Sequence, residues 1–116
     1  MSRPHSVGKN LTANTLTTMF TVPTRNIAVA HDILMTNRGA GNKHISIYWY
    51  DKSANVSIEI VHERTVSAKT SAVIDSTFSF VMDEEDELRA ISETGSTMTV
   101  VASFDLEQRS TVQNFA

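Results

Sequence analysis

The chain has no cysteine, and it has only two prolines, four glycines and a single tryptophan in 116 residues. The absence of cysteine excludes a disulfide scaffold, a zinc site with thiolate ligands and a thiol nucleophile. Leucine is also scarce, with five residues against thirty-three isoleucines, valines and threonines combined. Because β-branched side chains favour an extended backbone over a helix, we expect an all-β protein.

Long apolar runs and a strong charge of either sign are also missing. No segment approaches the roughly 20 apolar residues that cross a bilayer, and residues 1–10 lack the apolar stretch of a secretory signal. A net charge of −3 and a pI of about 5.7 give no attraction toward nucleic acid or an anionic membrane. We therefore expect one domain with no nucleic-acid partner, no membrane contact and no signal for export.

Alternation of apolar and polar residues predicts seven or eight short strands. It runs through residues 16–22, 26–36, 43–50, 56–66, 72–74, 77–82, 88–92 and 97–104, with turn residues between the runs. The spacing predicts a single antiparallel β-sandwich over residues 14–106, of jelly-roll or immunoglobulin-like type. We expect residues 1–13 to be a polar arm and residues 107–116 a polar tail, ordered only where a partner holds them.

The same alternation assigns side chains to the core. Between residues 16 and 36 the period-two sets are Leu16, Thr18, Phe20 and Val22, then Ile27, Val29, His31, Ile33 and Met35, which makes His31 a histidine on an apolar face. Further along, the expected inward residues are Ile45, Ile47 and Trp49, and in the last run Met98, Val100, Ala102 and Phe104.

No catalytic or metal-binding motif is present. The four histidines, His5, His31, His44 and His62, are too widely spaced to share a metal ion. The acidic run at residues 83–87 lacks the spacing and central glycine of a calcium loop, so we interpret it as a solvated loop or a patch for a basic partner. There is no Gly-x-Ser-x-Gly elbow and no phosphate-binding glycine loop. We expect no cofactor, no metal and no enzymatic activity, although a paired-carboxylate hydrolase stays open.

The most aromatic segment is Tyr48-Trp49-Tyr50. Alternation places Trp49 in the core and both tyrosines outside, next to His44. Tyrosine buries a large area and keeps a polar end, which favours a protein interface, with the stacking of sugar rings as the alternative. The predicted interface residues are His44, Tyr48 and Tyr50, with Arg3 and His5 in the arm and Phe115 in the tail.

Several short motifs follow one another in a recognisable order. They are Asn10-Leu11-Thr12, Phe20-Thr21-Val22-Pro23, a strand ending at Asn37, Tyr48-Trp49-Tyr50-Asp51, and residues 85–89 followed by residues 100–104. Over Leu11 to Glu107 this order resembles the small β-sandwich virion structural proteins of tailed bacteriophages. Their last hairpin often reads Gly-Asp-x-Ile/Leu and then Val-x-Val-x-Ala-Ser, and Glu85 stands here where they usually have glycine.

The resemblance implies a non-enzymatic structural protein located in the virion. We expect a capsid decoration or cement protein that bridges shell subunits, or a neck or tail component. The implied partners are the major capsid protein or other virion proteins, with homo-oligomers in the assembled particle. A carbohydrate-binding module is the alternative from a different class. Because residues 1–10 are polar, we expect their deletion to leave the sandwich folded and to weaken assembly.

Overall fold

The computed structural model describes residues 2–74, 79–93, 95 and 97–108. Within these residues the secondary structure consists of β-strands. They are β1 (Ser2–Asn10), β2 (Thr17–Thr21), β3 (Asn26–Asn37), β4 (Lys43–Asp51), β5 (Val56–Val66), β6 (Thr70–Ile74), β7 (Phe80–Met82), β8 (Glu87–Ser92) and β9 (Met98–Gln108).

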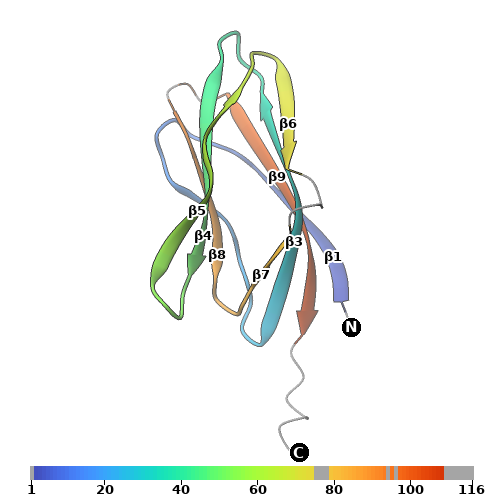
Figure 1. Cartoon of the computed structure of the whole chain (residues 1–116). Helices are drawn as coiled ribbons and strands as arrows, with labels where there is room; N and C mark the ends of the chain where they lie inside the picture. Colours follow the sequence, from blue (N-terminus) through green and yellow to red (C-terminus); the bar gives the residue numbers. More distant parts are fainter. Residues whose placement is uncertain (1, 75–78, 94, 96, 109–116) are drawn as a thin grey trace, which may run out of the picture.

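Two antiparallel sheets face each other as a sandwich (Figure 1). Sheet A has the order β1-β9-β3-β6, with β7 also paired to β3, and sheet B has the order β2-β8-β4-β5. The pairing is nested around the β4–β5 hairpin: β3 pairs with β6 and β7, β2 with β8, and β1 with β9. Nested pairing across two sheets defines a jelly roll. The predicted fold class is therefore confirmed, and of its two predicted types the jelly roll is the one observed.

The first strand occupies the segment that we expected to be a free arm. β1 pairs with β9 at nine consecutive positions, from Ser2 opposite Glu107 to Asn10 opposite Thr99. The sandwich therefore extends from residue 2 to residue 108, beyond the predicted limits at both ends. Alternation could not reveal β1 because its described side chains are exposed except for Val7. The remainder of the predicted tail, residues 109–116, lies outside the described residues.

The core lies between the two sheets, and β9 contributes most to it. The predicted inward residues of β9 are all buried, and Leu106 continues the series. On β4, Ile45 and Ile47 are buried and Trp49 packs against the core as predicted. The ring centroids of Phe20 and Phe104 lie 4.2 Å apart, which joins the two sheets at one edge. Each fully buried aliphatic or aromatic side chain contributes about 1.5–3 kcal/mol through loss of water contact.

A β-bulge in β3 reverses the expected faces of its first half. The register against β9 shifts between Ala30 and Asp32, because His31 is an extra residue on this strand. An extra residue moves every side chain on one side of it to the opposite face. The prediction was therefore right for Ile33 and Met35 and wrong before the bulge, where the buried residues are Ala28 and Ala30 in place of Ile27, Val29 and His31.

A second bulge has the same effect on β2. Its register against β8 shifts between Thr18 and Phe20. Met19 and Val22 are buried as a result, while Leu16 is 50% exposed although alternation grouped it with the apolar set. The strand itself was predicted, and the bulge explains why its inward set was only partly right.

The acidic run forms a tight turn between β7 and β8 that is built around a buried carboxylate. Asp86 is only 2% exposed. Its side chain accepts hydrogen bonds from Trp49 Nε1 at 3.0 Å and from the backbone N–H groups of Lys52 at 3.0 Å and Asp83 at 2.9 Å. The interpretation of this run as a solvated loop was therefore wrong for Asp86, which fastens the turn to the β4–β5 hairpin.

The backbone of Glu85 is left-handed, with a φ of 66°. Glycine adopts this conformation without the steric cost that a Cβ adds. We expect Glu85→Gly to raise the free energy of unfolding by about 0.5 kcal/mol, as measured by urea denaturation. Glu85→Ala is the control because it removes the contact of the Glu85 carboxylate with Thr24 and keeps the Cβ. Equal stability of the two variants would show that strain at this residue is not the cause.

Candidate interface and pocket on sheet B

Three of the predicted interface residues lie together on one strand. His44, Tyr48 and Tyr50 occupy alternate positions of β4 and face away from the core, on the outer side of sheet B. Arg3 and His5 lie on β1 at the edge of the other sheet, where the His5 ring stacks on Phe104 with centroids 5.8 Å apart. Phe115 lies outside the described residues. The structure therefore places three of the predicted residues together on β4, and it places Arg3 and His5 on the other sheet.

Tyr50 is held by a polar network on this face. Its hydroxyl donates a hydrogen bond to Asn55 Oδ1 at 2.5 Å. The Arg89 guanidinium carbon lies 4.2 Å from the centre of the Tyr50 ring, and Arg89 Nε donates to Glu87 Oε1 at 2.8 Å. This bond to Arg89 holds the pKa of Glu87 below its ordinary value. Because a guanidinium covers one face of the Tyr50 ring, that face is closed to a stacked sugar.

Tyr48 belongs to a second network, which it shares with β5. Glu59 lies opposite Tyr48 in the register, and Glu59 Oε2 is 3.0 Å from His62 Nδ1. Burial raises the pKa of the Tyr48 hydroxyl, and the negative charge of Glu59 raises it further. The hydrogen bond between Glu59 and His62 lowers the pKa of Glu59 and raises the pKa of His62.

This pair gives a prediction for pH titration. We expect the pKa of His62 to lie above its ordinary value of 6.5 in the folded chain, and Glu59→Gln to bring it back toward that value. Because folding raises this pKa, the contribution of His62 to stability is present below pH 6.5 and is lost as the pH rises through the folded-state pKa. The contribution of Glu59, whose pKa is lowered, is present above pH 4.5 and is lost on acidification.

Titration of the histidine ring protons by NMR measures the effect. Glu63→Gln is the matched control, because Glu63 Oε1 lies farther from the His62 ring, at 3.8 Å from Nε2. A His62 pKa that stays the same in Glu59→Gln, or that falls more in the control, would contradict the assignment.

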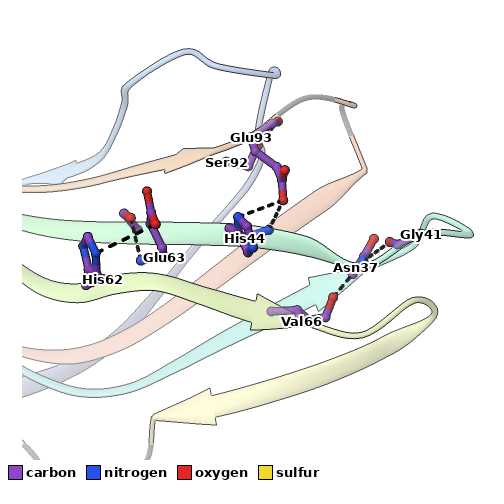
Figure 2. Close-up of polar contacts among 9 residues, drawn as sticks. Asn37, Gly41, His44, His62, Glu63, Val66, Ser92 and Glu93 are labelled. Carbon is purple, nitrogen blue, oxygen red and sulfur yellow. Dashed lines mark hydrogen bonds and ion pairs between the residues drawn. The ribbon is translucent and has the colours of Figure 1, made fainter.

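A small pocket opens beside His44, and Figure 2 shows the side chains of His44, Glu63 and Glu93 that border it. Its volume is about 170 Å³, and it is lined by Asn14, His44, Ser46, Glu63, Ile91, Ser92 and Glu93. The backbone N–H of His44 donates to Glu93 Oε1 at 2.6 Å, and the same oxygen lies 3.2 Å from His44 Nδ1. Glu63 lies where the register of β5 against β4 shifts, and its backbone N–H donates to Ser46 Oγ at 2.9 Å. Glu63 and Glu93 therefore border a space that is smaller than the 300–1,000 Å³ of common small-molecule sites.

The described residues around this pocket include the carboxylates of Glu63 and Glu93. In the part of the chain that the structure describes, no serine or threonine hydroxyl is hydrogen-bonded to a histidine ring nitrogen, so no nucleophile is paired with a base. The described residues also contain no group of three or more side chains placed to hold a metal ion. An ammonium or guanidinium group can be accepted by the carboxylates of Glu63 and Glu93.

Sequence reasoning missed an apolar row on the outer face of sheet A. Val73, Leu34, Val101 and Gly8 lie directly opposite one another across β6, β3, β9 and β1. Val73 is 49% exposed and Leu34 is 36% exposed. The sequence did contain a signal for this row, because Leu34 and Val101 are apolar residues at strand positions that alternation places on the outer face.

Asn37 was noted only as the end of a strand, yet it is fully buried. Its Nδ2 donates to the carbonyl oxygens of Gly41 at 2.7 Å and Val66 at 3.0 Å (Figure 2). Its Oδ1 accepts from the backbone N–H of Gly39 at 2.9 Å and from Thr97 Oγ1 at 3.0 Å. One amide therefore ties three chain segments together at the end of the sandwich that borders the pocket.

No protein-family model matches the sequence, and no curated protein matches it. Among solved structures, the chain is similar to a protein of Bacillus endospore appendages, which form disulfide-linked pili. The TM-score is 0.58 and the sequence identity is 14%, and the match covers 95% of this chain and 88% of that chain. It is also similar to a chain of the T13 viral particle of infectious bursal disease virus, with a TM-score of 0.59 and 8% identity over 95% of this chain and 32% of that chain.

A third similar structure is the VP2 subviral particle of infectious bursal disease virus, with a TM-score of 0.55, 8% identity and coverage of 95% of this chain and 33% of that chain. The chain therefore spans about a third of the length of the two viral chains. At these identities the likeness establishes the fold. Within the described residues there is also no helix with the length and hydropathy needed to span a membrane.

Proposed function

We propose that the chain is a structural subunit of a virus particle, and more specifically a decoration or cement protein on a bacteriophage capsid. The observation that carries this proposal is the jelly roll itself, which aligns over 95% of the chain with subunits of pili and of virus particles. The order of sequence motifs that resembles tailed-phage virion proteins supports the same class. Most of the described residues belong to strands, and the described connections between strands are short.

A neck or tail position is the alternative within the same class, and both positions place the chain in the virion. A carbohydrate-binding module is less well supported, because one face of Tyr50 lies under Arg89 and both tyrosines are tied to neighbouring side chains. A sugar-binding site of this kind requires an aromatic side chain with an accessible ring face on which the sugar can stack. Jelly rolls occur in both capsid and lectin domains, so the fold alone does not separate the two classes.

We further propose that the contact with a shell subunit, such as the major capsid protein, lies on the outer face of sheet B. His44 is half-exposed there, and Glu63 and Glu93 give the adjoining pocket a negative charge. A lysine or arginine of the partner fits this pocket by charge and by size. Each such contact is small, and repeated copies on a symmetric shell add their contributions through multivalency.

Sedimentation with shell particles that lack this protein tests both statements. The unmodified chain is expected to sediment with the particles, and His44→Lys is expected to bind about tenfold more weakly because it adds a positive charge where a basic side chain of the partner docks. Val73→Lys is the matched control, since it adds the same charge to an exposed strand position on the other sheet. Loss of binding in Val73→Lys alone would move the contact to sheet A. Binding to a glycan array without binding to particles would overturn the structural role.

A further inference from the structure

We propose that β1 is exchanged between copies of the chain, so that β1 of one subunit completes sheet A of the next by pairing with its β9. This inference builds on the proposed function, because it specifies how neighbouring copies are joined in an assembly. The partner is a second copy of the same chain, and the exchanged element is residues 2–10.

The main chain accounts for most of what holds β1 in place. β1 is an edge strand and pairs with β9 at nine consecutive positions without a register shift. Its side chains from Arg3 to Asn10 are exposed, apart from Val7, which packs against the core. An identical strand from another copy would make the same main-chain hydrogen bonds, so exchange would cost little in contacts.

The edge of β9 that pairs with β1 must be paired with a strand, and this strand can come from the same copy or from another copy. β9 lies between β3 and β1 in sheet A, and its inward side chains are buried along its length. If β1 were withdrawn and not replaced, the backbone N–H and C=O groups of β9 on that side would lose their partners. An unpaired edge of this length readily accepts a strand from another chain. Withdrawal of β1 is therefore favourable only when a second copy fills the place.

Side-chain contacts specify which strand fits. His5 stacks on Phe104, and Thr99 Oγ1 donates a hydrogen bond to Asn10 Oδ1 at 2.7 Å. At Gly8 the backbone passes so close to β9 that an added Cβ would lie 3.3 Å from Val101 Cγ2. These contacts fix the register, and they favour β1 of another copy over an unrelated strand.

The chain is anchored immediately after β1, which gives the exchange a defined hinge. Leu11 is 1% exposed and donates its backbone N–H to the carbonyl of Met98 at 2.8 Å. Asn14 donates in the same way to Ser92 at 2.9 Å. A rotation about the backbone φ and ψ angles of Asn10 leaves strands β2 to β9 in place. The nine residues of β1 then reach a neighbour within about 30 Å when extended.

Because the chain has no cysteine, a disulfide introduced between β1 and β9 reports directly on exchange. Ser6 and Ser103 lie directly opposite each other in the register. Two single variants, Ser6→Cys and Ser103→Cys, are mixed and then allowed to assemble, either at high concentration or with shell particles. The mixture is then oxidised, and its products are separated on a non-reducing gel. The double variant shows that the pair can form a bond. Thr36→Cys and Thr99→Cys, opposite each other on the inner strands β3 and β9, are the control mixture.

Exchange predicts a disulfide-linked dimer in the Ser6→Cys and Ser103→Cys mixture and none in the control mixture. The proposal is overturned if the double variant closes only within one chain and the mixture of single variants gives no dimer. Dimers of equal yield in both mixtures would overturn it as well, since they would reflect random collision. Sedimentation of the same samples with shell particles reports on the proposed function independently, so failure of exchange and failure of particle binding are distinguished.

Discussion

Replacing Asp86 with alanine is expected to lower the free energy of unfolding by about 3 kcal/mol. The carboxylate is 2% exposed and accepts hydrogen bonds from Trp49 Nε1 and from the backbone N–H groups of Lys52 and Asp83. Its removal leaves these three donors without that acceptor in a place where water has little access. Urea denaturation followed by the fluorescence of Trp49, the only tryptophan in the chain, measures the loss.

A double-mutant cycle separates the indole contact from the backbone contacts. Trp49→Phe removes one of the three donors, so Asp86→Ala is expected to cost about 1 kcal/mol less in that background, as followed by circular dichroism. Glu107→Ala removes an exposed carboxylate from β9 and is expected to change stability by less than about 0.5 kcal/mol. If Asp86→Ala were no more destabilising than Glu107→Ala, the turn would not depend on the buried carboxylate.

Replacing Asn37 with aspartate is expected to cost about 3 kcal/mol or more at neutral pH. The amide donates to two carbonyl oxygens, those of Gly41 and Val66, and a carboxylate would place negative charge against both of them. Asn37→Ala removes the contacts without adding charge, so its expected cost is smaller, at about 2 kcal/mol. Protonation restores one donor, and the penalty of Asn37→Asp should therefore shrink on acidification.

Thermal and urea unfolding at two pH values measure these differences. Asn42→Ala is the control, because Asn42 is an exposed asparagine at the same end of the sandwich and accepts one bond from the backbone of Ala68. A stability loss in Asn37→Asp that matches this control, or that grows at low pH, would contradict the role of Asn37.

Alternation assigned the inward face correctly where no extra residue interrupts the period. β4 is the clearest case, because Ile45, Ile47 and Trp49 all face the core as expected. In β3 the extra residue His31 inverts the first half of the strand, and a sequence pattern does not show which residue will be the bulge. β1 escaped prediction because the positions that align with the inward residues of β9 include Arg3, His5 and Lys9.

The structure brings together only some of the predicted interface residues, for a related reason. His44, Tyr48 and Tyr50 share one strand, so period two alone places them on one face. The pocket beside them also requires Glu63, which comes from β5, and Glu93, which directly follows β8, and strand pairing brings them together. Asp86 was misread because a run of acids is normally solvated, and its burial depends on a tryptophan 37 positions earlier in the chain.

The most direct test of the structural role is a density map of the virus particle that contains this chain. We predict jelly-roll density at repeated, symmetry-related positions on the particle, with the order β1-β9-β3-β6 in one sheet and the outer face of β4 against a shell subunit. Particles that lack such density, although the chain is produced in the infected cells, would show that it is not part of the virion.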